Sequence, residues 1–267
     1  MTGAAAEASR AWNAMMMAAD RDYPAATPPR VRYAILSVPR SGSTLLARAL
    51  GASRRYGDPH EYLNPNAIDA WKAGRAVSEA FDLATYLSEI ERRRTSPEGY
   101  FGIKVHFRHF TLAYGDRAFA AAADFVARQD RLIFIRRRDQ VAQAVSYHAA
   151  RSTGRWTSEH EPFFGPAPVS AVPFDVPALD ACLDEVVRGE ANWRSVLAAC
   201  GSPFLEIDYE DLVGDYEATV ATALRWLGAS APVVPPLPTR PSRIGADGLL
   251  DRYRRLRASG TIAAGGG

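Results

Sequence analysis

A five-residue polar loop between two apolar segments is the part of this chain with the clearest chemistry. It interrupts the segment YAILSVPRSGSTLLARAL, residues 33–50, between a strand-like run and an amphipathic helix pattern. The loop offers one guanidinium, three hydroxyls and one glycine: Arg40, Ser41, Gly42, Ser43 and Thr44. Backbone N–H groups and the helix dipole favour an anion at a helix N-terminus, and arginine donates in pairs to phosphate or sulfonate oxygens. The loop lacks the G-x-x-x-x-G-K-[ST] spacing of an NTPase. It therefore predicts an anion site of another kind, and a capped helix start is the alternative.

A run of three arginines, residues 136–138, forms a second candidate anion site. The run follows the apolar residues Ile133-Phe134-Ile135 and leads into a helix pattern. Three guanidinium groups at a strand end repel one another unless an anion lies among them. Ser146 lies further along that helix, where its hydroxyl either reaches the same anion or bonds back to a carbonyl. The alternative is a solvated basic turn in which Asp139 caps the helix and pairs with one arginine.

Strand-like and helix-like segments alternate along the chain, which predicts an α/β fold. The expected strands are short and rich in β-formers: 32–37, 100–105, 132–136 and 203–207. The expected helices lie near 9–19, 43–52, 66–92, 116–128, 139–150, 178–199 and 214–227. Alternation of this kind implies right-handed crossovers and a parallel sheet covered on both faces, with ligands beyond the carboxyl ends of its strands. The polar loop and the arginine run both fall at such ends.

Lys104 and His106 form a third candidate pair, near the end of the expected strand 100–105. Residues two apart in a strand face the same side, so the two side chains should point together. A lysine there suits stabilisation of charge on a transferring group, as in phosphoryl transfer. A hydrogen-bonded core histidine is the alternative for His106.

Composition and length limit the class of protein. The chain has 267 residues and a net charge of +2, which argues against a nucleic-acid partner. Its two cysteines fit neither a metal cluster nor a disulfide framework, so we expect no metal. No apolar run reaches the ~18 residues of a membrane span, and we expect a cytoplasmic protein. The expected organisation is a flexible or weakly helical segment (1–30), a single domain (31–258) and a disordered tail (259–267).

Several of these motifs together resemble those of one enzyme family. PRSGSTLL followed by IRRRDQVAQAVSY is similar to the paired donor-binding motifs of sulfotransferases that use 3′-phosphoadenylyl sulfate (PAPS). GDPHEYLN, GIK, the region of Trp156 and DRYRR follow the same order as in the bacterial Stf0 family. The resemblance spans residues 33–255 and implies a sulfotransferase fold with a P-loop-like central sheet.

The resemblance also implies roles for individual residues. The loop Arg40–Thr44 would hold the 5′-phosphosulfate of PAPS, and Arg137 with Ser146 would hold its 3′-phosphate. Arg138 departs from the family pattern, and we assign it no direct role. PAPS would be the donor, no metal would be needed, and the family suggests a homodimer. The acceptor would be a carbohydrate, with trehalose or a trehalose-like sugar or glycolipid first.

The acceptor hydroxyl needs a general base, and two residues compete for that role. Glu61, in GDPHEYLN, matches the candidate base of the Stf0 family and would also contact the acceptor. His106, in the Lys-x-His spacing of cytosolic aryl and alcohol sulfotransferases, is the rival and would suit a phenol or alcohol acceptor. Trp156 would form a wall against adenine or sugar, or would only pack in the core. A kinase, disfavoured by the loop, and a non-catalytic nucleotide-binding protein remain alternatives.

Overall fold

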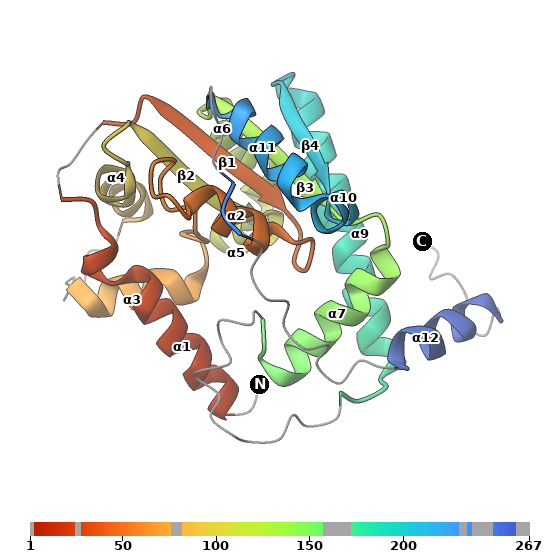
Figure 1. Ribbon diagram of the computed structural model, residues 1–267. Helices are drawn as coiled ribbons and strands as arrows, with labels where there is room; N and C mark the ends of the chain where they lie inside the picture. The colour runs from red at the N-terminus through yellow and green to blue at the C-terminus, as the bar shows by residue number, and fades with distance from the viewer. Residues whose placement is uncertain are drawn as a thin grey trace.

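Four parallel strands form the centre of the protein (Figure 1). The computed structural model describes residues 3–24, 28–75, 82–156, 172–229, 234–236 and 248–259. The strands are β1 (Val31–Ser37), β2 (Tyr100–His106), β3 (Arg131–Arg136) and β4 (Phe204–Asp208). Their order in the sheet is β2-β1-β3-β4, and each neighbouring pair is parallel. The predicted α/β class with a central parallel sheet is confirmed, and every strand boundary lies within one residue of its prediction.

Helices connect the strands and cover both faces of the sheet. In chain order they are α1 (Gly3–Met17), α2 (Ser43–Gly51), α3 (Pro65–Arg75), α4 (Leu83–Arg94), α5 (Phe107–Tyr114), α6 (Ala118–Ala127), α7 (Gln140–Thr153), α9 (Val176–Cys200), α10 (Tyr209–Gly214), α11 (Tyr216–Trp226) and α12 (Leu249–Ala258). Short 3₁₀ turns follow α1 at Ala19–Arg21 and α5 at Gly115–Arg117. Within the described ranges, no helix is both long and apolar enough to cross a membrane.

The prediction of one helix over residues 66–92 is wrong, because this stretch holds parts of two helices. α3 ends at Arg75, and α4 begins after Asp82, whose carboxylate accepts a hydrogen bond from the backbone N–H of Thr85 at 2.8 Å. An aspartate that caps a helix in this way marks a new N-terminus. The sequence prediction missed this N-terminus because the helical spacing of apolar residues continues past Asp82.

The alternation of β1 side chains explains the two-sided core. Tyr33 and Ile35 are fully buried against α2 and α11, in a cluster that includes Leu50 of α2. Ala34 and Leu36 are fully buried on the opposite face, in a cluster with residues of α4, α5, α6 and α9. Because successive strand residues point to opposite faces, a strand buried on both sides reads as a continuous apolar run. The carboxyl ends of the strands therefore remain as the place for a ligand.

The N-terminal segment packs against the domain through α1, which lies beside α3 (Figure 1). Residues 3–24 were expected to belong to a flexible or weakly helical segment, and they contain a 15-residue helix. A cluster of buried ion pairs ties the chain after α1 to the loop before α3 and to the end of α4. We call it the Arg94 cluster; its members are Arg21, Asp22, Asp58, Arg75 and Arg94. Of the expected tail 259–267, all but Ser259 lies outside the described residues.

Candidate active site

The loop between β1 and α2 has an unusual backbone. Arg40 and Gly42 both adopt positive φ angles, 67° and 85°. For the arginine this conformation costs about 1–3 kcal/mol, and such strain is common at functional sites. A β-carbon on Gly42 would lie 2.5 Å from Cδ2 of Tyr209, so the fold requires glycine there. The buried hydroxyl of Ser41 has no hydrogen-bond partner among the described residues. The loop thus presents unused donors at the N-terminus of α2, where an anion binds favourably.

The side chain of Arg40 connects this loop to α7. Its Nε donates to the hydroxyl of Ser146 at 3.0 Å, and its Nη1 donates to the backbone carbonyl of Trp156. Burial, and after it the positive charge of Arg137, lowers the pKa of the Arg40 guanidinium. No carboxylate in the described part of the chain forms an ion pair with Arg40. A buried guanidinium in a positive field, bonded only to neutral groups, is a site for an anion.

The structure separates the three arginines at the end of β3, because carboxylates from β4 and α10 neutralise two of them. Arg136 Nε lies 2.8 Å from Glu206 Oε1 and 2.9 Å from Asp208 Oδ1. Arg138 donates to Asp208 Oδ2 and to Asp211 Oδ1, both at 2.8 Å. These two arginines hold β3 against β4 and α10. The expectation that Arg138 has no direct role stays a prediction.

Arg137 is the remaining member of the run. Its guanidinium lies over the ring of Tyr209, 4.9 Å from the ring centre, and its Nε lies 4.0 Å from Glu210 Oε1. Within the described residues, its buried Nε has no hydrogen-bond acceptor. The positive charge of Arg137 contributes to the lowered pKa of Arg40, and Arg40 donates to Ser146. A shared anion site of Arg137 and Ser146 stays a prediction.

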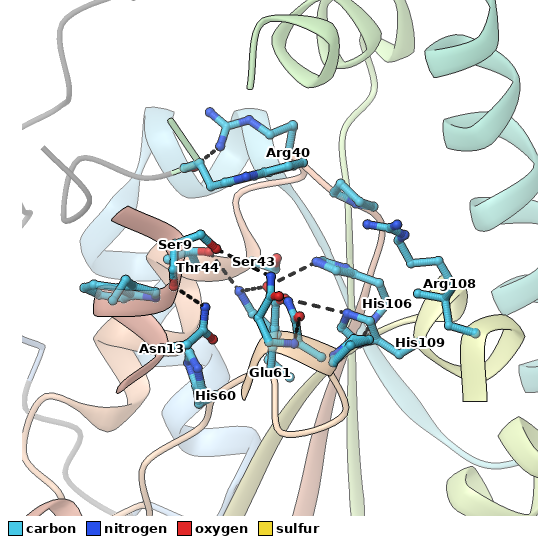
Figure 2. Close-up of a pocket in the computed structure, with 18 of the residues that line it drawn as sticks. Ser9, Asn13, Arg40, Ser43, Thr44, His60, Glu61, His106, Arg108 and His109 are labelled. Carbon is cyan, nitrogen blue, oxygen red and sulfur yellow. Dashed lines mark hydrogen bonds and ion pairs between the residues drawn. The ribbon is translucent and has the colours of Figure 1, made fainter. Parts of the chain in front are cut away.

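Lys104 and His106 face the same side of β2, as predicted, and both reach Glu61. Lys104 Nζ lies 2.7 Å from Glu61 Oε1, and His106 Nε2 lies 3.3 Å from the same oxygen. Lys104 also donates to the hydroxyl of Thr44 at 2.8 Å. Figure 2 shows Glu61, His106 and His109 grouped beneath Arg40. A carboxylate, an ammonium and the anion-binding loop are therefore in direct contact.

The side chain of Glu61 is half-buried, and its carboxylate is strongly stabilised as an anion. Asn64 Nδ2 donates to its Oε2 at 2.8 Å, and His109 Nε2 lies 3.6 Å from that oxygen. Burial alone would raise the pKa of Glu61, yet the charges of Lys104 and His106 outweigh it and hold this pKa well below its usual range. Burial lowers the pKa of His109 to about 3, so its ring is neutral. His109 was missed in the sequence because no motif marks it.

The hydrogen-bond partner of His106 Nδ1 indicates which ring nitrogen carries a proton. Nδ1 lies 2.9 Å from the hydroxyl of Ser37, which also lies 3.2 Å from the carbonyl of Val105. If Ser37 donates to Nδ1, the neutral ring carries its proton on Nε2, facing Glu61. If Ser37 donates to Val105 instead, Nδ1 carries a proton, and Nε2 must carry one too, because a bare lone pair would face the carboxylate. In either arrangement, the protonated Nε2 faces the carboxylate of Glu61.

A cavity of about 580 Å³ opens over these groups. Seven of the residues predicted from the sequence line it: Arg40, Ser43, Thr44, Glu61, Lys104, His106 and Trp156. The ring of Trp156 packs on Tyr147, 5.9 Å between ring centres, and also against the core, while its role as a wall against adenine or sugar stays a prediction. Ser41, Gly42, Arg137 and Ser146 are not among the residues that line this cavity. The described residues hold no group of His, Cys, Asp or Glu side chains arranged for a metal ion.

Comparison with known proteins agrees with this fold. The model of the Stf0 sulphotransferase family matches residues 32–256, and the chain belongs to this family, as its motifs predicted. Two curated relatives bear the same name, trehalose 2-sulfotransferase. The protein of Mycobacterium tuberculosis is 28% identical over 254 residues, which cover 83% of this chain and 94% of the relative. That of Mycolicibacterium smegmatis is 26% identical over 255 residues, which cover 84% and 94%.

Proposed function

We propose that this protein transfers the sulfuryl group of PAPS to a hydroxyl of a carbohydrate, with trehalose or a trehalose-like sugar as the first candidate. Family membership and the names of both relatives support the reaction class and the sugar. PAPS has anionic groups at its 5′ and 3′ ends, which suits one anion site at the loop Arg40–Thr44 and a second at Arg137 and Ser146. One observation carries the proposal: Lys104 contacts both Glu61 and Thr44, and so joins a candidate base to the donor loop.

In this mechanism, Glu61 takes the proton of the acceptor hydroxyl while the hydroxyl oxygen attacks sulfur in line. A sulfur–oxygen bond to the acceptor forms, the bond from sulfur to the phosphate oxygen breaks, and adenosine 3′,5′-bisphosphate leaves with the electron pair. Arg40 and Lys104 stabilise the charge on the sulfonate and on the leaving phosphate. When Lys104 turns toward that charge, Glu61 loses part of its stabilisation, its pKa rises, and it becomes a better base.

Glu61, rather than His106, is the base in this proposal. A base must present a lone pair to the acceptor, and the hydrogen-bond pattern of His106 puts a proton on Nε2, the atom next to Glu61. His106 then acts as a positioning residue that orients the carboxylate, in the way the third group of a catalytic triad orients its base. With Glu61 as base, the acceptor occupies the polar cavity over the carboxylate, which suits a sugar better than a phenol.

The test of this function is transfer of label from ³⁵S-labelled PAPS by the purified protein. Acceptors are trehalose, maltose, sucrose, glucose and 4-nitrophenol, and a reaction without acceptor is the control. We expect labelled trehalose or another labelled disaccharide and no labelled phenol. Label on the phenol alone would overturn the carbohydrate proposal and favour His106 as base. Tight binding of PAPS without transfer to any acceptor would favour a nucleotide-binding protein.

The proposed 3′-phosphate site gives a separate prediction. Arg137→Met removes a charged donor, and a hydrogen bond to a charged group contributes about 1.5–3 kcal/mol. We expect the KM for PAPS to rise about 10- to 100-fold, while the KM for adenosine 5′-phosphosulfate, which lacks the 3′-phosphate, changes little. Arg138→Met is the matched control, because carboxylates already hold that arginine. If Arg137→Met raises the KM for both donors equally, the assignment of the 3′-phosphate to this site is wrong.

A further inference from the structure

The N-terminal helix α1 forms one wall of the cavity that contains Glu61 and Lys104. Ser9, Trp12 and Asn13 line this wall, and their exposed fractions are only 6%, 8% and 5%. Figure 2 shows Ser9 and Asn13 on the side of the cavity where His60 lies. The family match begins at residue 32, so this wall lies outside the residues that the family model covers. The cavity of this protein therefore has a part that family membership does not explain.

Polar groups of Asn13 on α1 and of the neighbouring His60 are not fully paired within the described residues. Asn13 Nδ2 donates one hydrogen to the carbonyl of Ser9 at 2.7 Å, and no hydrogen bond to its amide oxygen is made by a described residue. His60 also lines the cavity, and its buried Nε2 has no hydrogen-bond partner within the described ranges. Burial lowers the pKa of His60 to about 4, so the ring is neutral at neutral pH. Buried polar atoms without partners are unfavourable, and a ligand that pairs with them gains affinity and specificity.

A chain of polar contacts links this wall to the proposed base. Asn66 Nδ2 lies 3.5 Å from the hydroxyl of Ser9, and the backbone N–H of Asn66 donates to Asn64 Oδ1 at 3.1 Å. Asn64 in turn donates to Glu61 Oε2 at 2.8 Å. The α1 wall and Glu61 therefore belong to one cavity, with the wall set apart from the reacting position by the loop of Asn64 and Asn66.

We propose that Ser9, Trp12, Asn13 and His60 form a subsite for the part of the acceptor sugar that does not react, the second ring of a disaccharide. The proposal rests on the proposed function, which it deepens by assigning acceptor selection to α1. A hydroxyl, an amide and a neutral imidazole pair with sugar hydroxyls, and indole packs on the apolar face of a sugar ring. None of the four side chains is charged at neutral pH, which favours a neutral acceptor. A volume of about 580 Å³ also suits a ligand larger than one sugar ring.

The double variant Ser9→Ala/Asn13→Ala tests the subsite with ³⁵S-labelled PAPS, trehalose and glucose. Loss of two hydrogen bonds of about 1 kcal/mol each predicts a rise of about 10- to 30-fold in the KM for trehalose. The KM for PAPS, and that for glucose, which does not reach the subsite, should stay within about twofold of the wild-type values. Asn13→Leu keeps a similar volume without polar atoms, and should raise the KM for trehalose even if the double variant folds poorly. Arg10→Ala, on an exposed position of α1, is the matched control.

The outcomes separate the subsite from the reaction itself. If the wild-type protein transfers label to trehalose and both variants keep its KM, the subsite proposal is wrong and the proposed function stands. A parallel rise in the KM for glucose would also contradict the subsite, because it would show a general loss of the cavity. If the wild-type protein labels no sugar, the proposed function fails first.

Discussion

Replacement of Glu61 by glutamine is expected to lower kcat by about 10²- to 10⁴-fold, the range that general-base catalysis contributes. Glutamine keeps the size and the hydrogen bond from Asn64 but cannot take a proton. PAPS binding should change far less, because Arg40, Ser41 and Arg137 remain in place. Initial rates with saturating trehalose, together with calorimetric binding of adenosine 3′,5′-bisphosphate, measure the two effects separately.

The same variant disturbs a buried ion pair, so its control must remove the charge imbalance. Glu61→Gln leaves the ammonium of Lys104 buried without its partner, and such breaks cost about 3–5 kcal/mol of folding free energy. Glu61→Gln/Lys104→Met removes both charges and should recover much of that stability while remaining inactive. Urea unfolding of the single and double variants measures the recovery. A double variant that regains activity with stability would show that Glu61 serves only the fold.

His106→Gln distinguishes the two candidate bases. Glutamine can still donate a hydrogen bond toward Glu61 but cannot act as a base. Because His106 only orients Glu61 in our proposal, its loss should reduce kcat less than Glu61→Gln does. A larger loss of kcat for His106→Gln than for Glu61→Gln would reverse the assignment.

The local parts of the fold were readable from the sequence because they follow short-range rules. Each strand is a short apolar run, and the two-residue period of β2 correctly placed Lys104 and His106 on one side. The polar loop was recognisable because an anion site at a helix N-terminus needs glycine, hydroxyls and a cation within a few residues. The choice of Glu61 as a candidate base came from the family motif, and its contact with Lys104 was not predicted, since nothing in the loop sequence itself shows where it folds.

The features that the sequence did not reveal depend on contacts between distant segments. For example, Asp208 and Asp211, about seventy residues later in the chain, decide which arginine of 136–138 remains available to bind an anion. Asn13 and His109 belong to no motif, and the motif GDPHEYLN, which contains His60, gives that histidine no role. A polar residue of this kind acquires a role only through the residues that pack around it. The same holds for the Arg94 cluster, whose members are scattered from residue 21 to residue 94.

The Arg94 cluster carries the second large expected effect, because it connects α1 to the loop of the proposed base. Arg94 has 1% of its side chain exposed and donates to Asp22 Oδ1 at 3.0 Å, to Asp58 Oδ2 at 3.0 Å and to the carbonyl of Ala18 at 3.1 Å. Burial alone would raise the pKa of Asp58, yet the hydrogen bond and charge of Arg21 and the charge of Arg94 hold it below its usual range. Asp58 lies three residues before Glu61, and Asp22 follows α1.

Arg94→Met is therefore expected to destabilise the protein by about 3 kcal/mol or more, since it leaves two buried carboxylates short of a partner. Because both α1 and the Asp58 loop lose an anchor, the KM for trehalose should rise more than the KM for PAPS, whose proposed sites lie on α2, β3 and α7. Chemical denaturation and initial rates measure the two effects. Arg92→Met on the same helix is the control: its ion pair with Glu89 is exposed, and such pairs contribute about 0–1 kcal/mol. If Arg94→Met lowers the free energy of unfolding no more than Arg92→Met does, packing of α1 on α3, and not the buried ion pairs, holds the N-terminal wall in place.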